Sequence, residues 1–101
     1  MYAVIDVETT GLSPKRNKII EIAIILFDGS QVKNEFYTLI NPERIIPRNI
    51  TRITGITDEM VQDKPKFWEV AKQIVELTNG KIFVAHNVTF DYNFIRHEFL
   101  E

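Results

Sequence analysis

Residues 19–40 read IIEIAIILFDGSQVKNEFYTLI, two apolar runs on either side of Asp28-Gly29. Asp-Gly is the strongest short-range signal for a β-hairpin, because the turn needs residues that tolerate positive φ. Residues 19–27 and 32–40 are therefore predicted as a pair of antiparallel strands. The hairpin fixes the direction of these two strands, and the remaining elements are predicted around it.

The residues before the hairpin add a first strand. Residues 2–7 read YAVIDV, a β-rich apolar run. Thr9-Thr10-Gly11 and Ser13-Pro14 then interrupt the apolar pattern and are typical of a loop. Together with the hairpin, this run predicts three strands in a meander.

The second half of the chain predicts helices around one further strand. Thr57 is followed by two acids, which is typical of an N-cap, so we expect a short helix there. From Phe67 apolar residues recur at helical spacing, and Asn79-Gly80 ends that helix. Residues 81–85 read as a short buried strand, and residues 90–99 begin another helix. The expected class is α/β, in the order β-β-β-α-β-α.

Composition describes one small domain and excludes several functions. The chain has 101 residues, of which 45% are hydrophobic and 26% charged, as expected for a single globular domain. A net charge of −2 excludes a uniformly basic nucleic-acid surface, although not a local phosphate site. The absence of cysteine excludes disulfides, zinc–thiolate sites and thiol catalysis. With no secretory signal and no apolar run of about 20 residues, a cytoplasmic setting is expected.

Asp6 and Glu8 form a pair of acids at the end of the first predicted strand. Residues two apart in a strand point to the same face, and neighbouring carboxylates repel each other. A divalent cation would remove that penalty, and carboxylate oxygens suit Mg²⁺ or Mn²⁺. An exposed strand end with solvated acids explains the pair alone equally well.

A third acid, Asp91, follows the fourth predicted strand where a helix begins, a position that the helix dipole favours for an anion. A right-handed crossover would lay this strand parallel to the first. The C-terminal ends of both strands would then open to one crevice, where α/β sheets place ligands. Asp6, Glu8 and Asp91 are therefore expected to converge there as a metal site.

Three motifs carry a family resemblance: DVETTGL at 6–12, ITGIT at 53–57 and VAHNVTFD at 84–91. Their order and spacing resemble the proofreading-type 3′→5′ exonucleases, the DEDD group typified by the epsilon subunit of bacterial DNA polymerase III. The resemblance implies a ribonuclease H-like mixed sheet. It also implies metal-dependent removal of nucleotides from nucleic-acid 3′ ends in proofreading or repair, with DNA favoured over RNA and a polymerase or fused domain as partner.

The resemblance also implies a role for each matching residue. Asp6, Glu8 and Asp91 would be the catalytic metal ligands for two Mg²⁺ (or Mn²⁺), with Asp6 bridging them. One ion would activate the attacking water and the other would stabilise the leaving 3′ oxygen. Backbone donors and packing surfaces for the terminal nucleotide would come from Thr9, Thr10, Gly11, Ile53, Thr54, Asn87 and Phe90. Of these, Ile53 and Phe90 would pack against base and sugar without sequence preference, although core filling explains Ile53 equally well.

The chain departs from the family pattern in two places. Thr54 stands where epsilon-like relatives often carry histidine. The family's last motif, a histidine base followed by a fourth acid, has no counterpart here, because His86 belongs to the second acidic motif and His97 lies inside a predicted helix. We therefore expect residues 1–101 to be an exonuclease domain truncated before that motif. Alone it would be weak or inactive, and its uncovered apolar surface would favour self-association.

Two other functions stay open. A non-catalytic nucleic-acid-binding or scaffolding module of the same fold would show no metal-dependent hydrolysis. A haloacid-dehalogenase-type phosphatase uses a D-x-D-x-T motif that DVETT resembles, but it needs Asp where Glu8 stands and a helix where this chain has its hairpin. The basic residues Lys15, Arg16 and Lys18 are explained better by a solvated loop than by a nucleic-acid contact.

Overall fold

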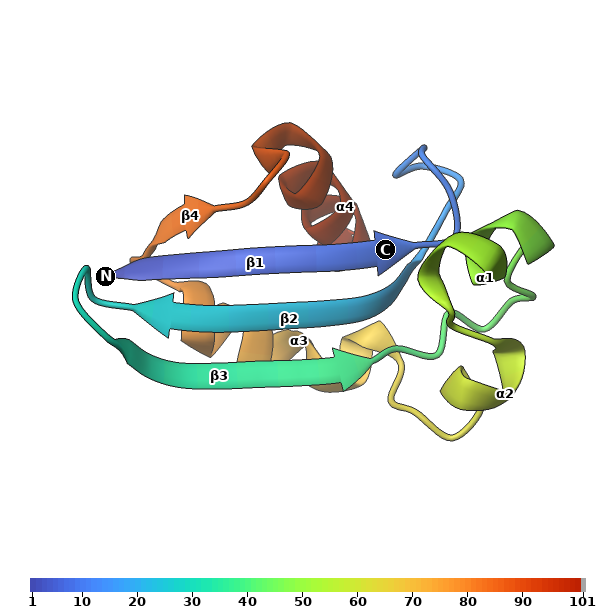
Figure 1. Ribbon diagram of the computed structural model, residues 1–101, viewed down its shortest axis with the longest axis horizontal. Coiled ribbons are helices and arrows are strands. Elements are labelled where there is room, and N and C mark those ends of the chain that lie inside the picture. Colours follow the sequence, from blue (N-terminus) through green and yellow to red (C-terminus); the bar gives the residue numbers. More distant parts are fainter. Residues whose placement is uncertain (101) are drawn as a thin grey trace.

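A computed structural model describes residues 1–100 as a four-stranded sheet with four helices (Figure 1). The strands are β1 (Tyr2–Thr9), β2 (Ile19–Phe27), β3 (Val32–Leu39) and β4 (Ile82–Val84). The helices are α1 (Arg48–Thr54), α2 (Asp58–Val61), α3 (Phe67–Thr78) and α4 (Val88–Leu100). None of these helices combines the length and apolar character needed to cross a membrane.

The sheet is mixed and has the strand order β3-β2-β1-β4. β1 pairs with β2 and β2 with β3 in antiparallel register, whereas β4 lies parallel to β1. The predicted meander and the predicted parallel crossover are both confirmed. The C-terminal ends of β1 and β4 therefore point the same way, although β4 stops opposite Val4.

The hairpin is confirmed, with a turn over residues 28–31. Gly29 has a φ of 100°, a value that side chains with a Cβ rarely tolerate. The Asp28 carboxylate accepts the N–H groups of Ser30 and Gln31 at 2.8 and 2.9 Å. These two bonds satisfy the turn backbone and hold β2 and β3 side by side.

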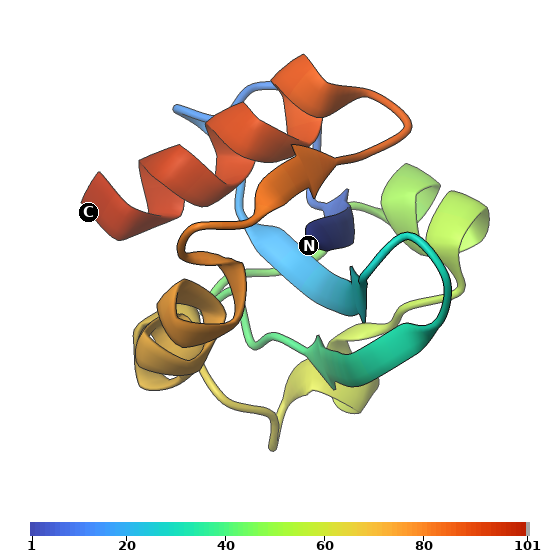
Figure 2. The same cartoon turned by 90° about the vertical axis from the view of Figure 1, so that its left-hand side faces the viewer.

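Helices α3 and α4 cover one face of the sheet, as Figure 2 shows from the end of the strands. In β1 the residues on that face, Ala3, Ile5 and Val7, are buried. They pack with β2 and with Ile74 and Phe94 of the two helices in one core. Within the described residues the other face carries exposed apolar side chains, namely Tyr2, Val4, Ile82 and Val84. From this surface we expect the self-association predicted above.

Two sequence-based predictions need correction. The strand predicted as buried is an edge strand: Ile82 is 58% exposed, because no helix in residues 1–100 lies on its outer face. Helix α1 was not predicted at all. It buries no residue and has no side-chain N-cap, so it lacks the apolar stripe and the cap that identify a helix in a sequence. The observed order therefore has three helices between β3 and β4.

Candidate active site

Asp6 and Glu8 lie on the open face of the sheet, on either side of the inward-pointing Val7. The antiparallel register places Glu21 of β2 directly opposite Glu8. Burial raises the pKa of Glu8, and the charges of Asp6, Glu21 and Asp91 raise it further. Sequence reasoning missed Glu21, because only the strand register places it beside the predicted pair. This part of β1 therefore carries concentrated negative charge.

Asp91 lies in the first turn of α4 and is only 5% exposed. The Val7 N–H donates to its Oδ2 at 3.2 Å. β4 pairs with β1 only as far as Val4, and Asp91 supplies an acceptor beyond the point where that ladder ends. Burial raises the pKa of Asp91 and the Asp6 charge adds to this, while the Val7 bond acts in the opposite direction.

The fold brings Asp91 to the segment of β1 that carries Asp6 and Glu8. The Asp91 carboxylate contacts β1 at the residue between Asp6 and Glu8. Among residues 1–100, however, no three acidic or histidine side chains stand close enough together to hold one metal ion. The side chains point in different directions. Asp91 points to the backbone N–H of Val7 at the edge of β1, whereas Asp6 and Glu8 project from the open face of the sheet.

The acids nevertheless fit a hard divalent cation by their chemistry. All three donors are carboxylates, the ligand type that Mg²⁺ and Mn²⁺ favour. The pKa values of Glu8 and Asp91 are both raised, partly by the neighbouring negative charges. A bound cation would relieve this repulsion.

The loop after β1 is closed by its own residues. The N–H of Thr10 donates to the Lys18 carbonyl at 2.8 Å, and the Lys18 N–H donates to Thr10 Oγ1 at 3.0 Å. Thr9 and Thr10 are buried, and a Cβ on Gly11 would come within 2.6 Å of the Asn17 side chain. In this structure the Thr10 N–H, one of the backbone donors that the resemblance implies for the terminal nucleotide, is bonded to the Lys18 carbonyl. A side chain at position 11 would therefore require the Asn17 side chain to move.

Of the remaining predicted substrate residues, Thr54 and Asn87 form hydrogen bonds within the fold, whereas Ile53 is exposed to solvent. Thr54 Oγ1 donates to the Ile50 carbonyl and accepts the Ile56 N–H, so it closes the end of α1. Asn87 Oδ1 accepts the Phe90 N–H at 3.2 Å and so supports the start of α4. Ile53, by contrast, is 77% exposed, which contradicts core filling.

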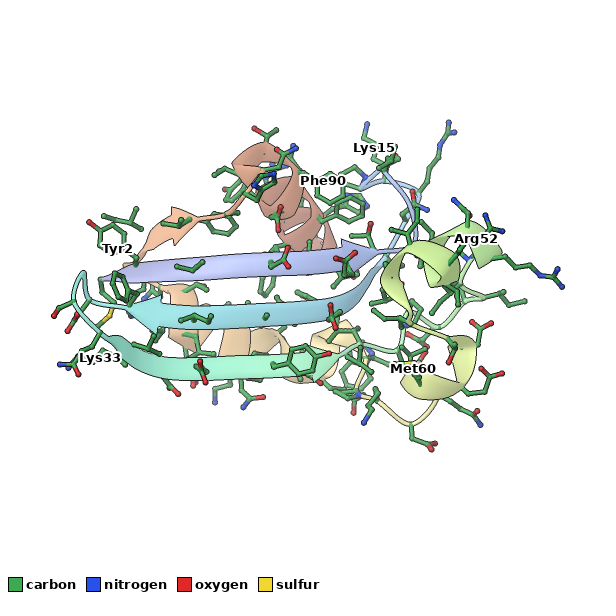
Figure 3. All side chains as sticks on the ribbon, viewed as in Figure 1. Tyr2, Lys15, Lys33, Arg52, Met60 and Phe90 are labelled. Carbon is green, nitrogen blue, oxygen red and sulfur yellow. The ribbon has the colours of Figure 1, made fainter. Side chains whose placement is uncertain are left out.

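Phe90 lies between these two cases. It is half-buried, and its ring centroid lies 4.8 Å from that of Phe94. Figure 3 shows it at the start of α4, on the same side of β1 as the loop that carries Lys15. A ring in this position retains an exposed portion that a nucleotide could contact.

Removing one charge from the acidic group should stabilise the protein at neutral pH in the absence of metal. Glu8 and Asp91 have raised pKa values in the folded state, so stability falls as pH rises from the unfolded values near about 4 through the folded ones. We expect Asp6→Asn to raise Tm at pH 7 by about 2–4 °C, corresponding to about 0.5 kcal/mol.

Asp6→Asn should not raise Tm at a pH below about 4, because Glu8 and Asp91 are then protonated in both the folded and the unfolded protein. Thermal unfolding in EDTA at both pH values measures the difference. Asp63→Asn removes an exposed acid elsewhere and serves as the control. An unchanged or lower Tm for Asp6→Asn at pH 7 would show that repulsion between Asp6 and the carboxylates of Glu8 and Asp91 does not destabilise the fold.

Comparison with known proteins places this arrangement in a family. The family model described as Exonuclease matches residues 3–101. The chain is 44% identical over 98 residues to the 3'-5' exonuclease DinG of Bacillus subtilis (strain 168), covering 96% of the chain and 10% of that protein. It is 39% identical over 97 residues to DNA polymerase III subunit epsilon of Treponema pallidum (strain Nichols), covering 96% of the chain and 45% of that subunit.

A solved structure agrees in fold. Exonuclease X in complex with 5' overhanging duplex DNA superposes with a TM-score of 0.80 at 33% identity, over 94% of this chain and 54% of that one. The chain thus spans between a tenth and about half of these relatives. Since the family model covers residues 3–101, nearly the whole chain, the chain belongs to the exonuclease family.

Proposed function

We propose that this domain removes nucleotides from the 3′ end of a nucleic acid by metal-dependent phosphodiester hydrolysis, with DNA as the favoured substrate. The observation that supports this best is the contact between the Asp91 carboxylate and the Val7 N–H. It brings the third family acid to the strand segment that carries Asp6 and Glu8. The DNA bound in the Exonuclease X structure supports the choice of substrate.

Asp6, Glu8 and Asp91 would hold two Mg²⁺ (or Mn²⁺). Cations bound in such a site lower the pKa of a water molecule and neutralise charge on the phosphate. β1 pairs with β2 at both Asp6 and Glu8, so the two acids project from a paired strand. The buried Val7 N–H fixes Asp91. The side chain of Ile53 is exposed for contact with the terminal base or sugar.

The phosphatase alternative is wrong. Its motif requires a helix after the first strand, whereas β1 is followed by the antiparallel β2–β3 hairpin, and the family is that of the exonucleases. A non-catalytic nucleic-acid-binding or scaffolding module remains the second candidate. The absence of a ready three-ligand cluster in residues 1–100 is the observation that favours it.

Degradation of a 5′-labelled single-stranded oligonucleotide separates the two functions. With the full-length protein in Mg²⁺ or Mn²⁺ we expect a ladder of products shortened from the 3′ end, and none in EDTA. The 101-residue chain alone should be slower by about 10²–10⁴, the usual contribution of a general base. Binding of the oligonucleotide without metal-dependent shortening by the full-length protein would favour the non-catalytic module.

A further inference from the structure

Half of the positive charge of the chain lies in two short segments. Of the 12 Lys and Arg residues, Lys15, Arg16 and Lys18 fall in residues 15–18, and Arg44, Arg48 and Arg52 in residues 44–52. The fold joins these segments at the C-terminal end of β1, where the Arg44 guanidinium donates to the Arg16 carbonyl at 2.6 Å. Figure 3 shows Lys15 and Arg52 at this end and Lys33 at the opposite end.

Five of these side chains are exposed and together form what we call the basic rim. Its members are Lys15, Arg16, Arg44, Arg48 and Arg52. Lys18 is left out because its ammonium pairs with the largely buried Glu98 carboxylate at 3.7 Å. The acids nearest to the rim residues along the chain are Glu8, Glu21, Glu43, Asp58 and Glu59. Of these, Asp58 accepts the Ile46 N–H at 2.8 Å and Glu21 accepts the Tyr37 hydroxyl.

Two of the rim arginines repel each other on α1. Arg48 and Arg52 are four residues apart on α1, and like charges at this spacing destabilise a helix by about 0.2–0.5 kcal/mol. α1 contributes only the partly buried Ile50 to the core and has no side-chain N-cap, so packing and N-terminal capping offset little of this repulsion. A bound polyanion would remove it.

The rim also continues from the candidate active site. Ile53, the exposed residue proposed to contact the terminal nucleotide, directly follows Arg52. The loop that carries Lys15 and Arg16 begins where β1 ends, just beyond Glu8. A strand whose 3′ end reaches the acids therefore has the rim beside its next phosphates, while the acids repel it elsewhere.

We propose that the basic rim binds the phosphodiester backbone upstream of the 3′-terminal nucleotide, so that the substrate is a single-stranded polynucleotide several nucleotides long. This rests on the proposed exonuclease function and adds the direction in which the substrate leaves the site. The backbone crosses the β1–β2 loop and α1. The contacts are electrostatic and independent of base sequence.

The test compares two variants with the same net charge. Arg48→Gln/Arg52→Gln removes two rim cations, and Lys33→Gln/Lys72→Gln removes two exposed cations outside the rim. Binding of fluorescein-labelled dodecathymidylate to the full-length protein is measured in EDTA between 50 and 300 mM NaCl. We expect the rim variant to bind roughly five- to tenfold more weakly per lost charge at 50 mM salt, with a log K against log salt slope reduced by about 1.4.

Hydrolysis of a small ester distinguishes failure of the rim from failure of the proposed function. The p-nitrophenyl ester of thymidine 5′-monophosphate has no upstream phosphates. In Mn²⁺ the rim variant should cleave it at the wild-type rate, while its KM for the oligonucleotide rises and kcat stays unchanged. Equal binding by the rim variant and the control variant would overturn the rim proposal, whatever the ester shows. Rim-dependent binding without hydrolysis of either substrate would support the proposed role of the rim and overturn the proposed exonuclease function.

Discussion

Asp6→Asn in the full-length protein is expected to lower the rate of 3′-nucleotide release by at least roughly 10³-fold while the fold stays intact. Asparagine keeps the shape of aspartate but loses the negative charge with which Asp6 would hold a divalent cation. The residue lies on the open face of β1 and does not belong to the buried core, so the substitution leaves packing unchanged. Single-turnover rates in Mg²⁺ measure the loss, and circular dichroism checks the fold.

Glu21→Gln is the matched control for this variant. Glu21 lies opposite Glu8 on the neighbouring strand and accepts a hydrogen bond from the Tyr37 hydroxyl. It matches no family acid, so its loss should change the rate less than tenfold. If Asp6→Asn retains a tenth of the wild-type rate with unchanged Mg²⁺ dependence, the metal-ligand role of Asp6 is wrong.

Phe94→Ala should produce the largest loss of stability, about 3–5 kcal/mol. Its side chain is fully buried between α4 and the sheet, in the core that contains Ile5 and Ile74. Phe94 lies one helical turn after Asp91 on α4, so the cavity would also loosen the contact that fixes the third acid. Urea unfolding of the 101-residue chain measures the change. The total free energy of unfolding of a domain of this size is about 5–15 kcal/mol, so this loss is a large share of it.

Phe99→Ala provides the comparison on the same helix. Phe99 is 39% exposed and meets Phe67 edge to face at a ring-centroid distance of 5.3 Å. Because much of the ring is already in solvent, its removal should cost about 1.5 kcal/mol or less. Similar losses for the two variants would mean that α4 is not held mainly by Phe94.

The amino-acid sequence determined the elements whose signals are local. The Asp-Gly pair and its two apolar runs predict the hairpin because turn geometry and strand alternation depend only on neighbouring residues. Thr57 likewise predicts the start of α2, where its side chain accepts the Met60 N–H. The motifs that contain Asp6, Glu8 and Asp91 identified the family in the same way.

Only the tertiary structure determined which residues these side chains contact. Whether Asp91 joins the strand acids depends on where β4 stops, because the Val7 N–H needs an acceptor only beyond that point. Glu21 comes opposite Glu8 through the strand register, and Arg44 reaches Arg16 across 28 residues of chain. Residues distant in sequence carry no local pattern that pairs them. Burying one face of the sheet under α3 and α4 leaves Asp6, Glu8 and the basic rim on the remaining surfaces, while Asp91 is buried against β1.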